Sequence, residues 1–133
     1  MAFVLDASIA AAWLLPDEEA ALADLALDRL AGERAHVPGL FWDELRNLFL
    51  SAERRGRIDE RYAEASLTRL RRLPIHCPGE AEDGHVLALA RSHRLTAYDA
   101  SYLELAIRES CPLVSLDRRL NEAAVEEGLP TLA

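Results

Sequence analysis

Lysine is absent from this chain of 133 residues, so all fifteen of its basic residues are arginine. This excludes phosphotransfer modules of the receiver type, whose chemistry relies on a lysine past a late strand. Cysteine is scarce, and Cys77 and Cys111 form no C-x-x-C arrangement, which excludes a zinc ribbon or a redox motif. No apolar run reaches the ~18 residues of a membrane-spanning helix, and Met1 is not followed by a basic leader. We expect a cytoplasmic protein without a membrane segment.

The balance of charge is acidic. Twenty-three acidic residues against fifteen basic ones give a net charge of −8 at pH 7, which is the wrong sign for holding nucleic acid by bulk electrostatics. Any contact with nucleic acid must therefore be local, through one of three arginine clusters. These clusters are Arg54, Arg55 and Arg57; Arg69, Arg71 and Arg72; and Arg118 and Arg119. From the sequence they are as consistent with RNA or a protein partner as with solvated helix faces.

Short apolar runs alternate with longer amphipathic ones along the chain, without an internal repeat or a linker. This alternation predicts a single α/β domain over residues 1–133 with a mostly parallel sheet of about four to five strands. The expected strands are 3–5, 35–37, 74–77, 95–98 and 112–115, with a weaker candidate at 130–132. The expected helices are 8–15, 17–31, 40–55, 59–72, 80–93, 100–109 and 118–127.

Three aspartates stand at the ends of expected strands. Asp6 ends the first strand, Asp99 directly follows 95–98, and Asp117 lies just past 112–115. Ligands of an open parallel sheet bind outside the carboxyl ends of its strands, so we expect these carboxylates to meet at one edge. Each alone could instead be a helix N-cap. Three converging carboxylates would repel one another unless a cation neutralised them, so the set predicts a metal.

Helical periodicity adds Glu44 to this set. In the expected helix 40–55, Glu44 falls at the edge of the apolar stripe, whereas its neighbour Asp43 points away from it. A carboxylate that faces the core needs a partner, which could be a metal or an arginine. Aspartates with a glutamate form an all-oxygen ligand set, which suits Mg²⁺ or Mn²⁺ rather than zinc. A metal-activated water could then attack a phosphodiester.

Four motifs together resemble the PIN-domain nucleases, specifically the VapC-type toxins of prokaryotic toxin–antitoxin pairs. The motifs are VLDAS at 4–8, ELRN at 44–47, YDASYLELA at 98–106 and LVSLD at 113–117, and they span nearly the whole chain. The resemblance implies a three-layer α/β/α fold of the PIN type. It also implies a metal-dependent ribonuclease, the toxin of a toxin–antitoxin pair, that forms a homodimer and is inhibited by a cognate antitoxin protein.

Carried over position by position, the resemblance implies specific site residues. Asp6, Glu44, Asp99 and Asp117 would be the acidic quartet that binds Mg²⁺ or Mn²⁺. Ser8 and Ser115 would be the small hydroxyl residues that accompany the first and last acids, and Asn47 would orient the glutamate.

Two alternatives differ in class from a nuclease. A phosphatase of the aspartyl-phosphate class would need a second aspartate two residues after the nucleophile, where this chain has Ser8. A catalytically silent binding or dimerisation module would keep the fold and use the acids structurally. Only activity can separate this second alternative from a nuclease.

Overall fold

Four parallel strands form the centre of the molecule, in a computed structural model that describes residues 1–16 and 20–132. The strands are β1 (Ala2–Leu5), β2 (Arg34–His36), β3 (Ile75–His76) and β4 (Leu113–Val114), and their order is β3-β2-β1-β4. Val4 of β1 pairs with His36 on one side and with Leu113 on the other. The chain thus builds outward from β1 to β3 and returns to add β4 at the opposite edge. The switch point therefore lies between β1 and β4, where ligands of such sheets bind.

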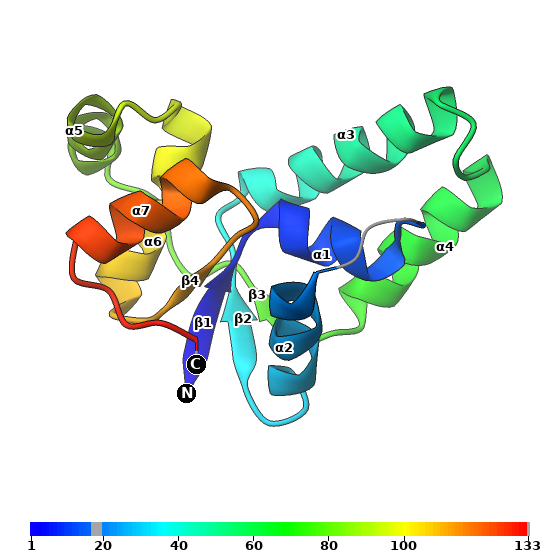
Figure 1. The fold of residues 1–133 in the computed structure, drawn as a ribbon, viewed down its shortest axis with the longest axis horizontal. Helices are drawn as coiled ribbons and strands as arrows, with labels where there is room; N and C mark the ends of the chain where they lie inside the picture. The colour runs from blue at the N-terminus through cyan, green and yellow to red at the C-terminus, as the bar shows by residue number, and fades with distance from the viewer. Residues whose placement is uncertain (17–19, 133) are drawn as a thin grey trace.

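Helices cover both faces of this sheet. Figure 1 shows α5, α6 and α7 on one side and α1 to α4 on the other. Their bounds are α1 (Ala7–Leu14), α2 (Ala21–Arg29), α3 (Leu40–Arg54), α4 (Glu60–Arg71), α5 (Asp83–His93), α6 (Ala97–Glu109) and α7 (Arg118–Glu126). The three-layer α/β/α arrangement predicted from the sequence is confirmed.

Burial of the central strand explains its composition. Phe3, Val4 and Leu5 are all fully buried, because helices pack on both faces of β1. A strand covered on both faces needs a continuous apolar run rather than alternation, which is what the sequence has at this point.

The predicted strand 95–98 is wrong. Thr96 is the N-cap of α6, and its hydroxyl accepts a hydrogen bond from the backbone N–H of Asp99. The helix thus begins at Ala97, three residues before its predicted start, and Asp99 lies in its first turn rather than at a strand exit. A four-residue apolar run does not by itself distinguish a strand from a helix start, and here the threonine cap decided the outcome.

Two further predictions concern the margins of the fold. The weak strand candidate 130–132 is also wrong, because the described residues there form no strand. The predicted helix 17–31 corresponds to α2, but its predicted start at 17–19 lies outside the described residues. None of the described helices has the length and apolar character needed to cross a membrane.

Candidate functional site

Asp6 occupies the end of the central strand and is held by two serines. Its backbone is the N-cap of α1, but its side chain makes no capping hydrogen bond. Instead Oδ2 of Asp6 accepts hydrogen bonds from the hydroxyls of Ser8 at 2.9 Å and Ser115 at 2.5 Å. Burial raises the pKa of Asp6 above its ordinary value, and the two hydroxyls act against this rise.

The two serines also tie β1 to the chain that leaves β4. Oγ of Ser115 accepts the backbone N–H of Asp117 at 2.9 Å, and Oγ of Ser8 accepts that of Leu116 at 3.2 Å. Each hydroxyl therefore accepts a hydrogen bond from one backbone N–H and donates one to the carboxylate of Asp6. Asn121, which the sequence reasoning missed, completes the arrangement by donating to the carbonyl of Ser115 at 2.9 Å. The position of Asp6 is thus fixed in part by Ser115, which lies 109 residues away in the chain.

Glu44 faces inward from α3, as its helical phase predicts. Oε1 of Glu44 accepts a hydrogen bond of 2.5 Å from the hydroxyl of Tyr102 on α6. Tyr102 is fully buried, and the pKa of its hydroxyl is raised, first by burial, so this group remains a donor. Asp43 is exposed and pairs with Arg46 at 2.9 Å. The arginine partner considered for Glu44 is not found among the described residues.

Asp99 and Asp117 begin two helices at the same edge of the sheet. Asp117 is the N-cap of α7, and its Oδ1 accepts the backbone N–H groups of Arg119 at 2.8 Å and Leu120 at 3.2 Å. Asp99 stands in the first turn of α6, three residues after the capping Thr96. Their positions at helix starts therefore explain in part why aspartate occurs at these two places.

Electrostatic coupling links the four acids. The pKa of Glu44 is raised by burial, then by the charges of Asp6 and Asp99, although the hydrogen bond from Tyr102 lowers it. The pKa of Asp99 is raised by burial and by the charges of Asp117 and Asp6. Carboxylates whose pKa is raised by neighbouring carboxylates gain from a cation placed between them.

The ligand set fits a hard divalent cation. All of its donors are carboxylate or hydroxyl oxygens, which Mg²⁺ and Mn²⁺ prefer. Among residues 1–16 and 20–132, no three side chains of His, Cys, Asp or Glu already stand close enough to hold one ion. Mg²⁺ is commonly bound through one or two carboxylates with several waters retained, so a site without a prebuilt cage still suits it.

The remaining sequence candidate, Asn47, lies apart from these contacts. Its side chain is exposed, and it makes no hydrogen bond to any residue that the structure describes. The contact expected of Asn47 toward Glu44 is made by Tyr102 instead. The available signal was a tyrosine among the apolar residues of the expected helix 100–109, because a buried hydroxyl must find a partner.

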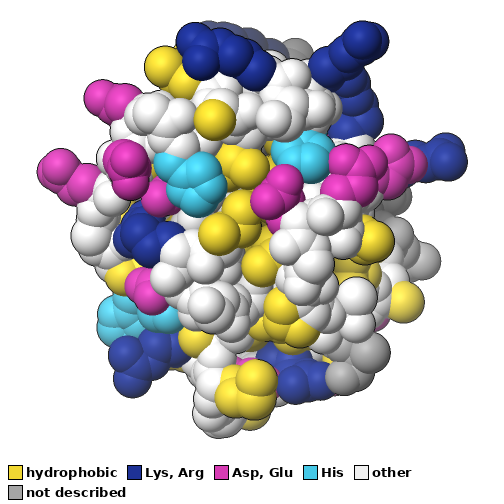
Figure 2. All heavy atoms as spheres, turned by 90° about the vertical axis from the view of Figure 1, so that its left-hand side faces the viewer, with side chains coloured by type: hydrophobic (Ala, Val, Ile, Leu, Met, Phe, Trp, Pro, Cys, Tyr) yellow, Lys and Arg dark blue, Asp and Glu magenta, His cyan; other side chains and the backbone are white. Residues whose placement is uncertain are grey.

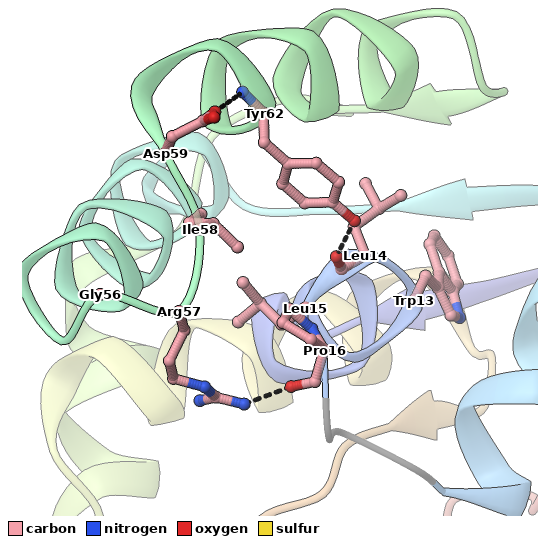
Figure 3. A pocket seen from close by; sticks show the side chains of 9 residues that line it. All are labelled: Trp13, Leu14, Leu15, Pro16, Gly56, Arg57, Ile58, Asp59 and Tyr62. Carbon is pink, nitrogen blue, oxygen red and sulfur yellow. Dashed lines mark hydrogen bonds between the residues drawn. The ribbon is translucent and has the colours of Figure 1, made fainter.

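One open pocket of the molecule is separate from the acids. It has a volume of about 640 Å³ and lies between the end of α1 and the connection from α3 to α4. Figure 3 shows the hydroxyl of Tyr62 on the carbonyl of Leu14, and the guanidinium of Arg57 on that of Pro16. None of the four acids lines this cavity.

Comparisons with known proteins agree with this fold. A family model of the PIN domain matches residues 3–126. Ribonuclease VapC3 of Pyrobaculum aerophilum is 34% identical over 127 residues, which cover 92% of this chain and 94% of that protein. Ribonuclease VapC9 of Mycobacterium tuberculosis is 33% identical over 120 residues, which cover 90% and 88% of the two chains.

A solved structure shows the same architecture. The crystal structure of PAE2754 from Pyrobaculum aerophilum matches with a TM-score of 0.67 at 23% identity, covering 92% of this chain and 84% of that one. The family resemblance inferred from the four motifs is confirmed, because the family model and relatives above 30% identity both span most of the sequence. This chain therefore belongs to the PIN-domain family.

Proposed function

We propose that this protein is a metal-dependent endoribonuclease whose active site is formed by Asp6, Glu44, Asp99 and Asp117. One observation carries the proposal. Besides burial, the charges of Asp6 and Asp99 raise the pKa of Glu44, and the charges of Asp117 and Asp6 raise the pKa of Asp99. Carboxylates gathered from separate elements in this way cost stability unless a cation relieves them. The names of the relatives, ribonuclease VapC3 and ribonuclease VapC9, support RNA as the substrate.

In the proposed reaction a water oxygen attacks phosphorus and loses a proton to solvent, and the bond from phosphorus to one ribose oxygen breaks as that oxygen takes up a proton from solvent. Asp6, Glu44 and Asp99 would hold Mg²⁺ or Mn²⁺, with Asp117 contacting the ion through water. When bound, the ion would lower the pKa of water and balance charge on the phosphoryl oxygens. Ser8 and Ser115 orient Asp6, and the Tyr102 hydroxyl favours the ionised form of Glu44. The chemistry needs no 2′-hydroxyl, so DNA is also a permissible substrate.

The proposed biological role rests on the resemblance to the VapC-type toxins. We infer a cytoplasmic toxin of a toxin–antitoxin pair that forms a homodimer and is inhibited by a cognate antitoxin protein. Expression without an antitoxin should arrest bacterial growth, and size-exclusion chromatography with light scattering should give twice the mass of the chain. Unimpaired growth at confirmed expression of folded protein would contradict the toxin role.

The activity itself is tested on purified protein freed of any partner. RNA should be cleaved with Mg²⁺ or Mn²⁺, and cleavage should stop in EDTA and return when the metal is restored in excess. Asp6→Asn and Asp99→Asn should both abolish cleavage while remaining folded by circular dichroism. Cleavage that persists in folded Asp99→Asn would overturn the proposed site.

A catalytically silent module is the second candidate. It is favoured by the helix-start positions of Asp117 and Asp99 and by the lack of a ready-made group of three ligands among the described residues. This candidate predicts no cleavage of RNA or DNA with any divalent metal, and Asp6→Asn would then change no function of the protein.

A further inference from the structure

Arg119 extends from the first turn of α7 toward the start of α6. Its backbone N–H donates to Oδ1 of Asp117 at 2.8 Å. At the other end of the side chain, one guanidinium nitrogen donates to the carbonyl of Arg94 at 3.1 Å. Arg94 ends α5 and stands two residues before Thr96, the residue that caps α6. The cation is therefore anchored between the two helix starts that carry Asp117 and Asp99.

The carbonyl that holds the Arg119 side chain belongs to a residue in the left-handed backbone conformation. Arg94 has φ 55° and ψ 43°, a conformation that non-glycine residues adopt at some cost, and it turns the backbone between α5 and α6. A neutral carbonyl holds the guanidinium in place without cancelling its charge. Since a guanidinium has five N–H donors, one such bond leaves most of them available.

Arg118 provides a direct contrast at the preceding position. Its guanidinium forms an ion pair with Glu122 at 3.1 Å, and its side chain is 91% exposed. Arg119 has no such pair with a carboxylate within the described parts of the chain. Its guanidinium lies instead on the carbonyl of Arg94, just before the helix whose first turn carries Asp99. Arg119 thus supplies positive charge next to the acids without being neutralised by one of them.

An RNA substrate needs positive charge close to the acids, because the chain as a whole is acidic. The chain carries a net charge of −8, and on the face seen in Figure 2 the coloured arginine and acidic side chains are interspersed rather than gathered into a basic area. A phosphodiester approaching four carboxylates is repelled unless fixed positive charge helps to receive it. Guanidinium groups suit this task because their planar donors match phosphate oxygens.

We propose that Arg119 binds a phosphate of the RNA strand that is presented to Asp6, Glu44, Asp99 and Asp117. The inference rests on the proposed function and adds a substrate-binding residue to it. The carbonyl of Arg94 holds the side chain in one orientation, so less conformational freedom is lost on binding. The other reading of the same contacts is a tether between α7 and the connection from α5 to α6, with no role toward the substrate.

The test compares Arg119→Met with Arg118→Met, because both remove one positive charge from adjacent positions on the same helix. For Arg119→Met we expect the KM for a short oligoribonucleotide to rise at least about tenfold, a size typical of a lost charge-assisted contact. For Arg118→Met we expect a KM within about twofold of wild type, because a solvent-exposed ion pair contributes little. Thermal unfolding of each variant shows whether the fold is retained.

Salt dependence separates phosphate binding from a tether. Binding is measured by fluorescence anisotropy of a labelled oligoribonucleotide with Ca²⁺ in place of Mg²⁺. If Arg119 contacts a phosphate, the slope of log K against log salt should become shallower by about 0.7 in Arg119→Met, the amount expected for one contact to a single strand. Arg119→Lys should keep most of that slope because it keeps the charge. A tether predicts an unchanged slope in both variants.

The outcomes distinguish the inference from the proposed function. Cleavage by wild type with unchanged KM and salt slope in folded Arg119→Met would overturn the role of Arg119 and leave the nuclease intact. If Arg119→Met does not fold, the KM of Arg119→Lys distinguishes the two readings. A severalfold rise in KM would support a guanidinium contact to phosphate, and an unchanged KM would overturn it. No cleavage and no RNA binding by wild type would overturn both.

Discussion

The hydroxyl of Tyr102 on α6 donates a hydrogen bond of 2.5 Å to the carboxylate of Glu44 on α3. The bond joins helices from opposite sides of the sheet, and it opposes the effects of burial and of neighbouring charges on the pKa of Glu44. Tyr102 is therefore the group that favours an ionised Glu44 at the edge where the proposed metal would bind.

Replacing Tyr102 by phenylalanine should reduce activity and shift its pH dependence. Without the hydroxyl, the pKa of Glu44 rises further, so the acid limb of the kcat/KM profile should move to higher pH. We expect a ten- to hundredfold loss of cleavage, as for other groups that orient metal ligands. Stability should fall by about 1 kcal/mol, the usual contribution of such a hydrogen bond.

Tyr98→Phe is the matched control, because Tyr98 lies on the same helix with 66% of its surface exposed. Its activity and its pH profile should equal those of wild type. An unmoved acid limb in Tyr102→Phe would show that the hydrogen bond does not tune Glu44.

Ser115→Ala should impair both the fold and the metal site. Ser115 is fully buried, donates to Asp6 and accepts the backbone N–H of Asp117. Its loss removes one of the two hydroxyl donors to the buried carboxylate of Asp6, which costs about 1–3 kcal/mol in urea unfolding. The affinity for Mn²⁺ should fall about tenfold or more by calorimetry. Ser92→Ala, at an exposed position of α5, should change neither quantity, and an equal Mn²⁺ affinity in Ser115→Ala would contradict the role given to this hydroxyl.

Asp99→Asn should raise the thermal stability of the metal-free protein at neutral pH. The folded-state pKa of Asp99 lies above 3.8, so the folded state binds the proton more tightly than the unfolded state. The stabilisation from this group is complete below pH 3.8 and is lost as pH rises through the folded-state value. In EDTA at pH 8 the variant should therefore melt above wild type, and the difference should shrink toward pH 4.

Mg²⁺ should reverse the order of the melting temperatures of wild type and Asp99→Asn. Mg²⁺ is expected to raise the melting temperature of wild type much more than that of Asp99→Asn, because a ligand that binds only the folded state stabilises it by mass action. Equal shifts in both proteins would indicate that Asp99 takes no part in metal binding.

Ser110→Gly should stabilise the protein. Ser110 ends α6 in the left-handed conformation with φ 51°, and it is exposed. Glycine removes the strain of that conformation, for a gain of about 1 kcal/mol. Ser92→Gly, inside α5, should instead lose about 0.5–1 kcal/mol. Urea unfolding of the two variants should give changes of opposite sign, and the same sign in both would contradict the assignment of backbone strain to Ser110.

The sequence placed Asp99 at the correct edge for an incorrect reason. The predicted strand 95–98 does not exist, and Asp99 belongs to the first turn of α6. A helix that crosses over to a parallel strand begins at the carboxyl edge of the sheet, because it must return the chain to the opposite edge. An acid in the first turn of such a helix therefore reaches the same edge as an acid that follows a strand.

The sequence could predict which way Glu44 faces but not what it contacts. Helical phase distinguishes Glu44 from Asp43, since adjacent positions differ by about 100° around the helix axis. The partner Tyr102 lies 58 residues away in the chain, and only the packing of α6 against the sheet brings it there. The same limit applies to Arg119, whose anchor on the carbonyl of Arg94 depends on a backbone conformation without a local sequence signal.

The central claim is tested most directly by Mn²⁺-dependent RNA cleavage in wild type, Glu44→Gln and Asp43→Asn. The two variants remove one negative charge from adjacent residues, of which only Glu44 is coupled to Asp6 and Asp99. The account predicts that Glu44→Gln loses at least about a hundredfold in kcat/KM and that Asp43→Asn keeps the activity of wild type. Equal activity in all three folded proteins, or no Mn²⁺-dependent cleavage by wild type, would contradict it.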